Sequence, residues 1–232
     1  KAAAVLNNLS QTSGEPVLYF EAVLSALDDE DMLKASGASL RVRLYCRSRY
    51  PLSTFTQSKK VIPVMRLEST EEDQFNAFPS AVRRKIRRAR KHGFEIRSGN
   101  ARLLDDFMTV YHQNIRKLRS FGLPEEFFRL LLNFYEHGMA EIIVVYDGDT
   151  PVGSAIWLTF LGFAENPWFA TVHDFNRQYV SYLLHHEMIM KAVRSGCRFY
   201  SFGRSTRDGS VHHYKKQWKG DDMPLYLNAT HS

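Results

Sequence analysis

The order of apolar segments between Phe94 and Asn228 is the feature that most constrains the fold of this chain. Strands are predicted where short apolar or aromatic runs end in turn residues, and helices where apolar residues recur every three or four positions. The predicted order is strand, helix, helix, strand, strand, strand, helix, strand, strand. In chain order the segments are 94–98, 101–118, 123–138, 140–146, 152–163, 167–175, 177–196, 197–203 and a last strand around Leu225.

Turn and cap residues support these boundaries. The Asp147-Gly148 pair tolerates positive φ, so it predicts a hairpin turn between two neighbouring strands. Pro124 begins the second helix, and Gly138 and Gly196 end the second and third helices. We therefore expect the three strands that follow the second helix to be consecutive neighbours in one sheet.

The part of the chain before Phe78 gives weaker signals. Apolar residues alternate strictly with Arg or Tyr over residues 40–46, which predicts a half-buried strand. Residues 61–67 predict a second strand, weakened by Pro63. Ser69 or Thr70 is expected to cap a helix with acidic residues in its first turn.

The segment 78–96 carries all of the excess positive charge. The chain has 31 basic and 25 acidic residues, and seven of the basic ones lie between Arg83 and Lys91, which leaves 24 against 25 elsewhere. We predict a helix capped by Ser80 and ended by Gly93. Its apolar residues form a narrow stripe, so most of the helix is expected to face solvent; they are Val82, Ile86 and Ala89.

Composition narrows the class of protein. With 44% hydrophobic and 13% aromatic residues, the chain can bury a core. Cys46 and Cys197 are far apart and form no CxxC, as in proteins of reducing compartments. The first residues lack the apolar core of a signal peptide, and the longest apolar run, 155–164, is about half of a membrane span. We therefore expect a cytoplasmic protein.

Three short motifs near the C-terminus resemble the signature of FemAB-like proteins: "FGRST" (202–206), "YKKQW" (214–218) and "PLYL" (224–227). The branch most similar to them is the one associated with exosortase and exopolysaccharide gene clusters. The predicted element order likewise resembles the GNAT, or acyl-CoA N-acyltransferase, fold. The chain departs from the family pattern at Ser201, where Asp is common, and at Lys219, which separates Trp218 from Gly220.

The resemblance implies the fold and the domain organisation. We expect an α+β protein with a GNAT-like mixed sheet flanked by helices. Residues 1–78 would be part of a second, N-terminal GNAT-like half, residues 79–93 a basic connecting helix, and residues 94–232 the C-terminal GNAT-like domain. A first half of this family is normally longer, so the chain is expected to lack its beginning.

The resemblance also implies an enzyme that transfers an acyl or aminoacyl group to an amine and forms an amide. Relatives use aminoacyl-tRNA to extend a peptidoglycan precursor, and others act on different cell-envelope or small-molecule amines. The donor would be aminoacyl-tRNA or a coenzyme A thioester, and no tightly bound cofactor is expected. The protein could contact a membrane-attached precursor without a transmembrane segment.

The segment "FNRQYVSYLL" (175–184) bears on the choice of donor. Acetyl-CoA enzymes of this fold hold the pyrophosphate with backbone N–H groups of a glycine-rich loop at a helix N-terminus. This segment has no glycine, and Tyr179 and Tyr182 are expected to crowd the phosphates. The pattern therefore disfavours coenzyme A in the C-terminal half.

The family match assigns candidate site residues. Lys215 would stabilise the oxyanion or the leaving oxygen, whereas Lys216 would be solvated. We expect the two lysines on a strand, where neighbouring side chains point to opposite sides. Arg204 would bind a carboxylate or phosphate or form a structural ion pair. The other candidates each have a structural alternative: Ser205 and Thr206 as anion ligands or turn caps, Tyr214 and Trp218 as substrate contacts or core, and His173 as a base or a surface residue.

The remaining patterns allow a second function. "HHE" (185–187) and His212-His213 lack metal-ligand spacing, so no metal site is predicted. The basic helix would offer its charges to the phosphates of RNA or of a nucleotide-linked substrate, or be a solvated linker. The alternative function is nucleic-acid binding on a catalytically inactive GNAT-like scaffold. The residues proposed for phosphate contacts are Arg83, Arg84, Arg87, Arg88 and Lys91.

Overall fold

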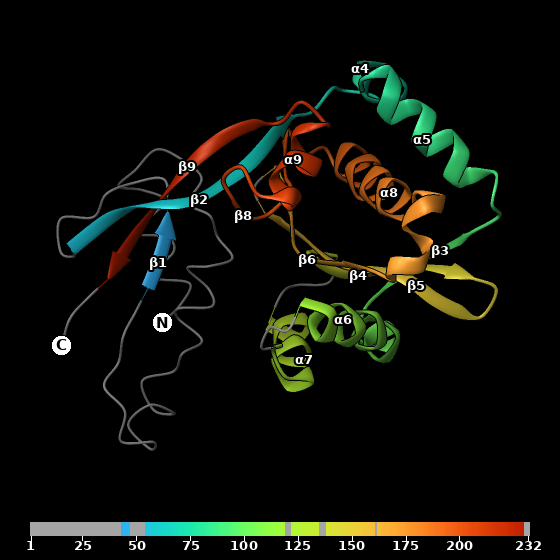
Figure 1. The fold of residues 1–232 in the computed structure, drawn as a ribbon, viewed down its shortest axis with the longest axis horizontal. Helices are drawn as coiled ribbons and strands as arrows, with labels where there is room; N and C mark the ends of the chain where they lie inside the picture. The colour runs from blue at the N-terminus through green and yellow to red at the C-terminus, as the bar shows by residue number, and fades with distance from the viewer. Residues whose placement is uncertain (1–42, 47–53, 119–121, 135–137, 161, 230–232) are drawn as a thin grey trace. The chain divides into compact units, whose positions relative to one another are not determined.

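The computed structural model describes residues 43–46, 54–118, 122–134, 138–160 and 162–229 (Figure 1). These residues group into two compact units. Unit 1 takes its described residues from 1–63, 204–212 and 221–232, and unit 2 consists of those in 64–203 and 213–220. The predicted boundaries at residues 78 and 93 stay a prediction.

Unit 2 is built on a mixed sheet whose strand order is β2-β7-β6-β5-β4-β3. Neighbouring strands are antiparallel except β6 and β7, which are parallel. The predicted strands 140–146, 152–163 and 167–175 are consecutive neighbours, so this expectation is confirmed. The strands are β3 (Glu95–Gly99), β4 (Ala140–Asp147), β5 (Thr150–Phe160), β6 (Phe163–Thr171), β7 (Phe199–Ser201) and the end of β2 (Thr54–Arg66).

The β4–β5 hairpin forms as its turn residues predict. Asp147 pairs with Thr150, which leaves a two-residue turn, and Gly148 has φ +58°. Both strands are buried along most of their length because helices cover both faces of the sheet. Their apolar runs are therefore nearly continuous rather than alternating.

Helices lie on both faces of this sheet (Figure 1). Helices α6 (Leu104–Leu118) and α7 (Glu125–Phe134) cover one face, and α8 (Val180–Arg194) covers the other. Helix α8 approaches β5 closely, since a Cβ on Gly153 would lie 2.7 Å from Val180 Cγ1. The predicted mixed sheet flanked by helices is thus confirmed.

Helix α8 is covered on its far side by the basic helix α5 (Ser80–Arg90) (Figure 1). The predicted stripe is confirmed, because Val82, Ile86 and Ala89 are buried. Ser80 is wrong as a cap: it is the first helical residue, and Pro79 is the N-cap without a side-chain bond. The preceding helix α4 (Glu71–Ala77) does begin as predicted, at Thr70, whose Oγ1 accepts from the Asp73 N–H at 3.1 Å.

Two short helical segments join the elements of unit 2. η1 (Ala101–Leu103) leads into α6, and η2 (His173–Gln178) precedes α8. The predicted helix over 177–196 therefore begins at Val180, after Tyr179 with φ 62°. Gly196 has φ +69° and follows the C-cap, as expected of a helix stop.

Unit 1 is made of strands. β1 (Arg43–Cys46) pairs antiparallel with β9 (Asp221–Ala229), and β8 (Ser205–Thr206) pairs antiparallel with Lys60 and Val61 of β2. Residues 40–42 of the predicted alternating strand lie outside the described residues. Residues 61–67 were predicted to be a weak strand because of Pro63, yet β2 continues through it. Pro63 lies between the residues that pair with β8 and those that pair with β7, so neither ladder needs its missing N–H.

Helix α5 should be held mainly by its apolar stripe. Replacing Ile86, which is fully buried, with Ala should reduce the free energy of unfolding by about 2–5 kcal/mol, since the helix can close the cavity only in part. Arg84→Ala on the exposed face of the same helix should change it by less than about 0.5 kcal/mol. Denaturant unfolding followed by circular dichroism compares the two variants, and equal losses would contradict this packing.

Candidate active site

The parallel strands β6 and β7 pair over only three positions. The last pair is Glu165 with Ser201. Next to this point the β5–β6 register shifts, so that Asn166 and Pro167 together oppose a single residue of β5, Trp157. Such a β-bulge bends the strand and redirects its side chains, and bulges are over-represented next to active sites.

Gly203 lies against this bulge. Its φ is +68°, and a Cβ there would be only 2.6 Å from the backbone oxygen of Asn166. The Gly203 N–H donates to Ser201 Oγ at 3.1 Å, and the Ser201 hydroxyl donates to Glu165 Oε1 at 3.1 Å. Only glycine fits this contact, because any side chain would meet backbone atoms. The chain after β7 is thereby held against the bulge.

Lys215 brings an ammonium group to the same place. The side chain is 7% exposed, and its Nζ donates to the Gly203 backbone oxygen at 2.8 Å. Lys216 is exposed and donates to the Gly220 oxygen at 2.9 Å. The predicted strand is wrong here, because both lysines lie on helix α9 (Ser210–Lys216). Neighbouring helical residues point about 100° apart, so only one of the two enters the interior.

Aromatic side chains next to Lys215 in the chain pack against α8. Tyr214 donates from its hydroxyl to the Ser181 oxygen at 3.0 Å, and burial raises its pKa well above the usual range. Trp218 is 1% exposed and stacks on Tyr182 at 5.7 Å, so it is part of the core. The Tyr182 hydroxyl, in turn, accepts from Lys85 of α5 at 2.7 Å. Whether Tyr214 and Trp218 contact substrate stays a prediction.

Two buried histidines on α8 follow one another. Burial lowers the pKa of His185 to about 3, helped by the positive charge of Lys215. Burial likewise lowers the pKa of His186 to about 3, with Arg90 and Arg194 adding to the effect. Both rings are therefore neutral near pH 7.

The remaining candidates are Arg204, Ser205, Thr206 and His173. Arg204 and Thr206 are exposed in unit 1, whereas Ser205 is buried on β8. Ser205 and Thr206 thus form a strand rather than caps, and Thr206 Oγ1 accepts from Lys60 at 2.5 Å. His173 is exposed on η2, with Nδ1 3.1 Å from Asn176 Nδ2. Their functional roles stay predictions.

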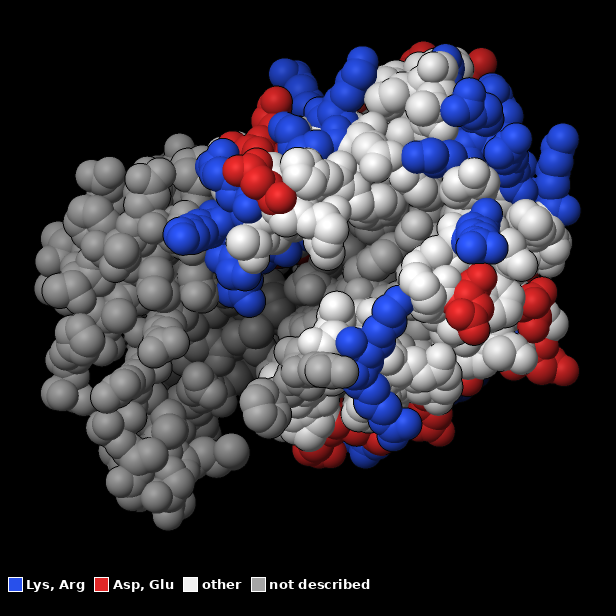
Figure 2. Space-filling view, viewed as in Figure 1, with Lys and Arg blue, Asp and Glu red and all other residues white. Residues whose placement is uncertain are grey.

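Helix α5 presents its charges on the surface. Figure 2 shows Lys and Arg gathered on the side where Figure 1 places α5. Lys85 is bonded to Tyr182 and to Gln217 Oε1, and Arg88 Nη1 donates to the Tyr179 hydroxyl at 3.5 Å. The helix itself contains no acidic residue. Of the predicted phosphate contacts, Arg84, Arg87, Arg88 and Lys91 are exposed and Arg83 is half-buried.

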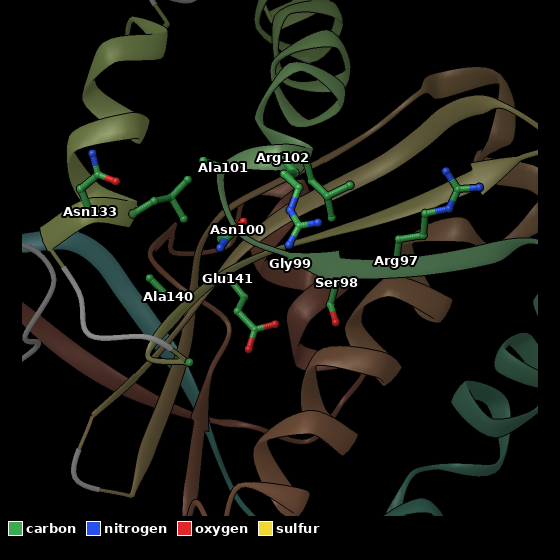
Figure 3. Close-up of a pocket in the computed structure, with 12 residues that line it drawn as sticks. Arg97, Ser98, Gly99, Asn100, Ala101, Arg102, Asn133, Ala140 and Glu141 are labelled. Atoms are coloured by element: carbon green, nitrogen blue, oxygen red, sulfur yellow. The ribbon is translucent and has the colours of Figure 1, made fainter.

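A surface hollow of about 720 Å³ lies elsewhere, beside β3 and the end of α7 (Figure 3). None of the predicted site residues is among those that line it. Arg97 is bonded to Glu95 at 2.7 Å and points away from Asn133 and Glu141, and Glu141 pairs with Lys191 at 2.9 Å. Arg97 and Glu141 therefore both have protein partners. Among the described residues, no group of three or more potential metal ligands is found, and no helix is long and apolar enough to cross a membrane.

Sequence reasoning did not select Glu165, Asn166, Gly203 or His185. The signals for the bulge and for its contact were present: Pro167 interrupts an apolar strand, and Gly203 directly follows one. His185 was considered only as a metal ligand. Its burial depends on packing between distant segments, which the local sequence does not reveal.

The sheet is mixed, and its central parallel pair stops pairing beside a bulge. A buried ammonium lies at that point. These features place the chain among GNAT-like transferases. A family model described as "Acetyltransferase (GNAT) domain" matches residues 78–216. The chain belongs to this family and is an acyltransferase. Among curated proteins, no sequence match was found.

Solved structures show the same fold at low identity. The crystal structure of FemX is similar with a TM-score of 0.68 and 12% identity, over 90% of this chain and 76% of that one. The C-terminal domain of a putative lysylphosphatidylglycerol synthetase from Agrobacterium fabrum gives 0.58 and 11%, over 87% and 71%. L-PGS from Bacillus licheniformis gives 0.56 and 10%, over 75% and 60%. The expected GNAT fold is thus confirmed.

The low pKa of the two buried histidines should make stability depend on pH. An unfolded histidine, with a pKa of about 6.5, binds protons between pH 6.5 and 3 that the folded chain excludes. Stability should therefore fall as the pH falls through this window, by up to about 1.4 kcal/mol per pH unit for each histidine. His186→Asn should reduce this slope when unfolding is measured between pH 7 and pH 5; an unchanged slope would show that His186 titrates normally.

Proposed function

We propose that this acyltransferase moves an acyl or aminoacyl group to an amine of a cell-envelope precursor or a related small molecule, forming an amide. The observation that carries the proposal is the Lys215 ammonium, buried where the pairing of β6 and β7 ends and hydrogen-bonded to Gly203. A fixed positive charge in a place shielded from water is what the developing oxyanion of acyl transfer requires. Lys215 is therefore assigned to the oxyanion or to the leaving oxygen.

The other predicted residues have supporting roles in this proposal. Arg204, Ser205 and Thr206 would bind an anionic part of the substrate, with the guanidinium suited to a carboxylate or phosphate. Tyr214 and Trp218 would shape the wall beside Lys215. His173 is a candidate base at the surface. The exposure of Arg204 and Thr206 supports access to substrate.

The nature of the acceptor follows from similarity rather than from a bound ligand. FemX and lysylphosphatidylglycerol synthetase share the fold, and the second name refers to an aminoacylated lipid. Together with the FemAB-like motifs, this supports an acceptor in the cell envelope, such as a peptidoglycan or exopolysaccharide precursor. The protein would work in the cytoplasm and meet a membrane-attached precursor there.

Features of α5 and α8 bear on the donor. The exposed arginines on α5 are suited to bind phosphates, which supports an aminoacyl-tRNA as the donor. The N-terminus of α8 follows Tyr179 and has no glycine-rich loop, which disfavours the pyrophosphate of coenzyme A there. We propose aminoacyl-tRNA as the donor, with a coenzyme A thioester as the alternative.

The test is a transfer assay with a panel of donors and amines. Aminoacyl-tRNAs and coenzyme A thioesters would each be incubated with nucleotide-linked cell-wall precursors, and mass spectrometry would detect a new amide. An amide from one donor class supports the proposal and selects the donor. Polyanion binding without any transfer would support the alternative of an inactive scaffold, which the family match does not favour.

Lys215→Ala should lower kcat by about 100- to 1000-fold, because a donor to the oxyanion is lost. Lys216→Ala is the matched control and should keep most of the activity, since Lys216 is exposed and its Nζ donates to the Gly220 oxygen rather than to Gly203. Circular dichroism would check that both variants are folded. Equal activity of the two variants would remove Lys215 from the mechanism.

The basic face of α5 should give nonspecific RNA affinity at low salt. Changing Arg84, Arg87 and Arg88 to Glu should abolish binding in a filter or anisotropy assay. Charge reversal of Arg116, Lys117 and Arg129, exposed on α6 and α7, makes the matched control. Each triple variant changes the net charge from +6 to 0, that is 6 − 3 × 2, so the two variants are matched in net charge. If the wild type binds no RNA at low ionic strength, α5 is a solvated linker.

A further inference from the structure

His185 lies beside the point where the pairing of β6 and β7 ends. Its ring centroid is 4.2 Å from that of Phe169 on β6 and 5.3 Å from that of Phe202, which directly follows β7. Since the two strands stop pairing at Glu165 and Ser201, the His185 ring contacts one residue beyond the last pair on each side. The side chain is 1% exposed.

One ring nitrogen of His185 is fixed by two oxygen atoms. Nδ1 lies 3.2 Å from the Ser181 backbone oxygen and 3.0 Å from the Tyr214 hydroxyl. A carbonyl oxygen can only accept, so a lone pair on Nδ1 would face it unfavourably. The proton of the neutral ring is therefore assigned to Nδ1, and Nε2 carries the lone pair.

The other ring nitrogen, Nε2, is not satisfied by the described part of the protein. The atom is buried and finds no hydrogen-bond partner among the described residues. Leaving a polar atom buried and unpaired costs about 1–3 kcal/mol, and such atoms are rare in folded proteins. Since Nδ1 holds the ring in place, the lone pair of Nε2 has a fixed direction.

From this geometry we infer that His185 Nε2 is the atom that takes the proton from the attacking amine. The inference rests on the proposed function. The charge of Lys215 acts on the same ring and, together with burial, keeps the resting imidazole neutral and its lone pair free for a proton. The same low pKa makes His185 a weak base, so it is suited to accept a proton only from a strongly acidic group and to give the proton up again.

The step can be written with all atoms balanced. The neutral amine attacks the acyl carbonyl carbon, a C–N bond forms, and the carbonyl electron pair moves to oxygen beside Lys215. The adduct nitrogen is then cationic and strongly acidic, and it gives its proton to Nε2. Collapse of the oxyanion breaks the bond to the ribose oxygen or thiol sulfur of the donor. That leaving atom takes the proton from Nε2, so His185 is neutral again and the products are an amide and an alcohol or thiol.

This assignment competes with the one made for His173. His173 is exposed on η2, and its Nδ1 contacts Asn176. No observation connects it with Lys215, whereas the positive charge of Lys215 acts on His185 directly. If His185 is the base, its replacement should remove activity and replacement of His173 should not. If His173 is the base, the reverse is expected.

The experiment uses variants that remove single ring nitrogens. His185→Asn keeps an N–H at the position of Nδ1 but has no atom at Nε2; His185→Gln can place an amide oxygen there, which accepts a hydrogen bond but not a proton. His186→Asn, on the next residue of the same helix, is the control for disturbing buried packing. The activity assay uses the donor and amine that react in the panel described above. Nitrogen-15 NMR of histidine-labelled wild-type protein reports which ring nitrogen carries the proton.

We expect both His185 variants to lose about 100-fold or more in kcat, because a positioned base contributes about that much. His186→Asn should stay within about threefold, and NMR should show a neutral His185 with its proton on Nδ1. A proton on Nε2, full activity of His185→Asn, or a loss confined to His173→Asn would overturn the assignment while leaving the transferase intact. Absence of transfer by the wild type with every donor would overturn the proposed function, and this assignment with it.

Discussion

The contact between the backbones of Gly203 and Asn166 is the constraint on which the site depends. It holds the chain that leaves β7 against the bulge of β6, at a distance that excludes every side chain. The Gly203 oxygen is thereby placed where Lys215 binds it, and the Gly203 N–H is placed on Ser201. A small change in this contact would therefore displace the ammonium and the end of the strand together.

Helix α8 carries His185, the other residue to which a role in the reaction is assigned. It is buried on nearly all sides because the sheet lies on one face and α5 on the other. Close packing of Val180 on Gly153 fixes the first turn of α8, and His185 lies one to two turns further along. The basic helix thus has a structural part, its apolar stripe, and a separate exposed face that remains available for an anion.

Much of the fold could be predicted because its signals are local. The β4–β5 hairpin follows from Asp147-Gly148, and the buried stripe of α5 follows from the spacing of Val82, Ile86 and Ala89. Helix α9 was missed because its seven residues are mostly polar and show no apolar period. Its position decides which lysine is buried, so Lys215 was selected by family resemblance and not by a structural argument.

The polar cluster was harder to predict than the fold. Glu165 and Ser201 are 36 residues apart and meet only because β6 and β7 are parallel neighbours across a helix. His185 meets Phe169 and Phe202 for the same reason. Sequence patterns describe one element at a time, whereas this cluster arises from the pairing of elements. Only the family resemblance brought one of its members, Lys215, into view.

The way Lys215 is held has a consequence for catalysis. Its Nζ donates to the Gly203 oxygen, and Gly203 is itself fixed against the bulge of β6 by a contact that only glycine fits. The ammonium is therefore already in position before any reaction begins, and no reorganisation of the protein is required when charge develops beside it. A preorganised charge of this kind favours the charged intermediate over the neutral substrate.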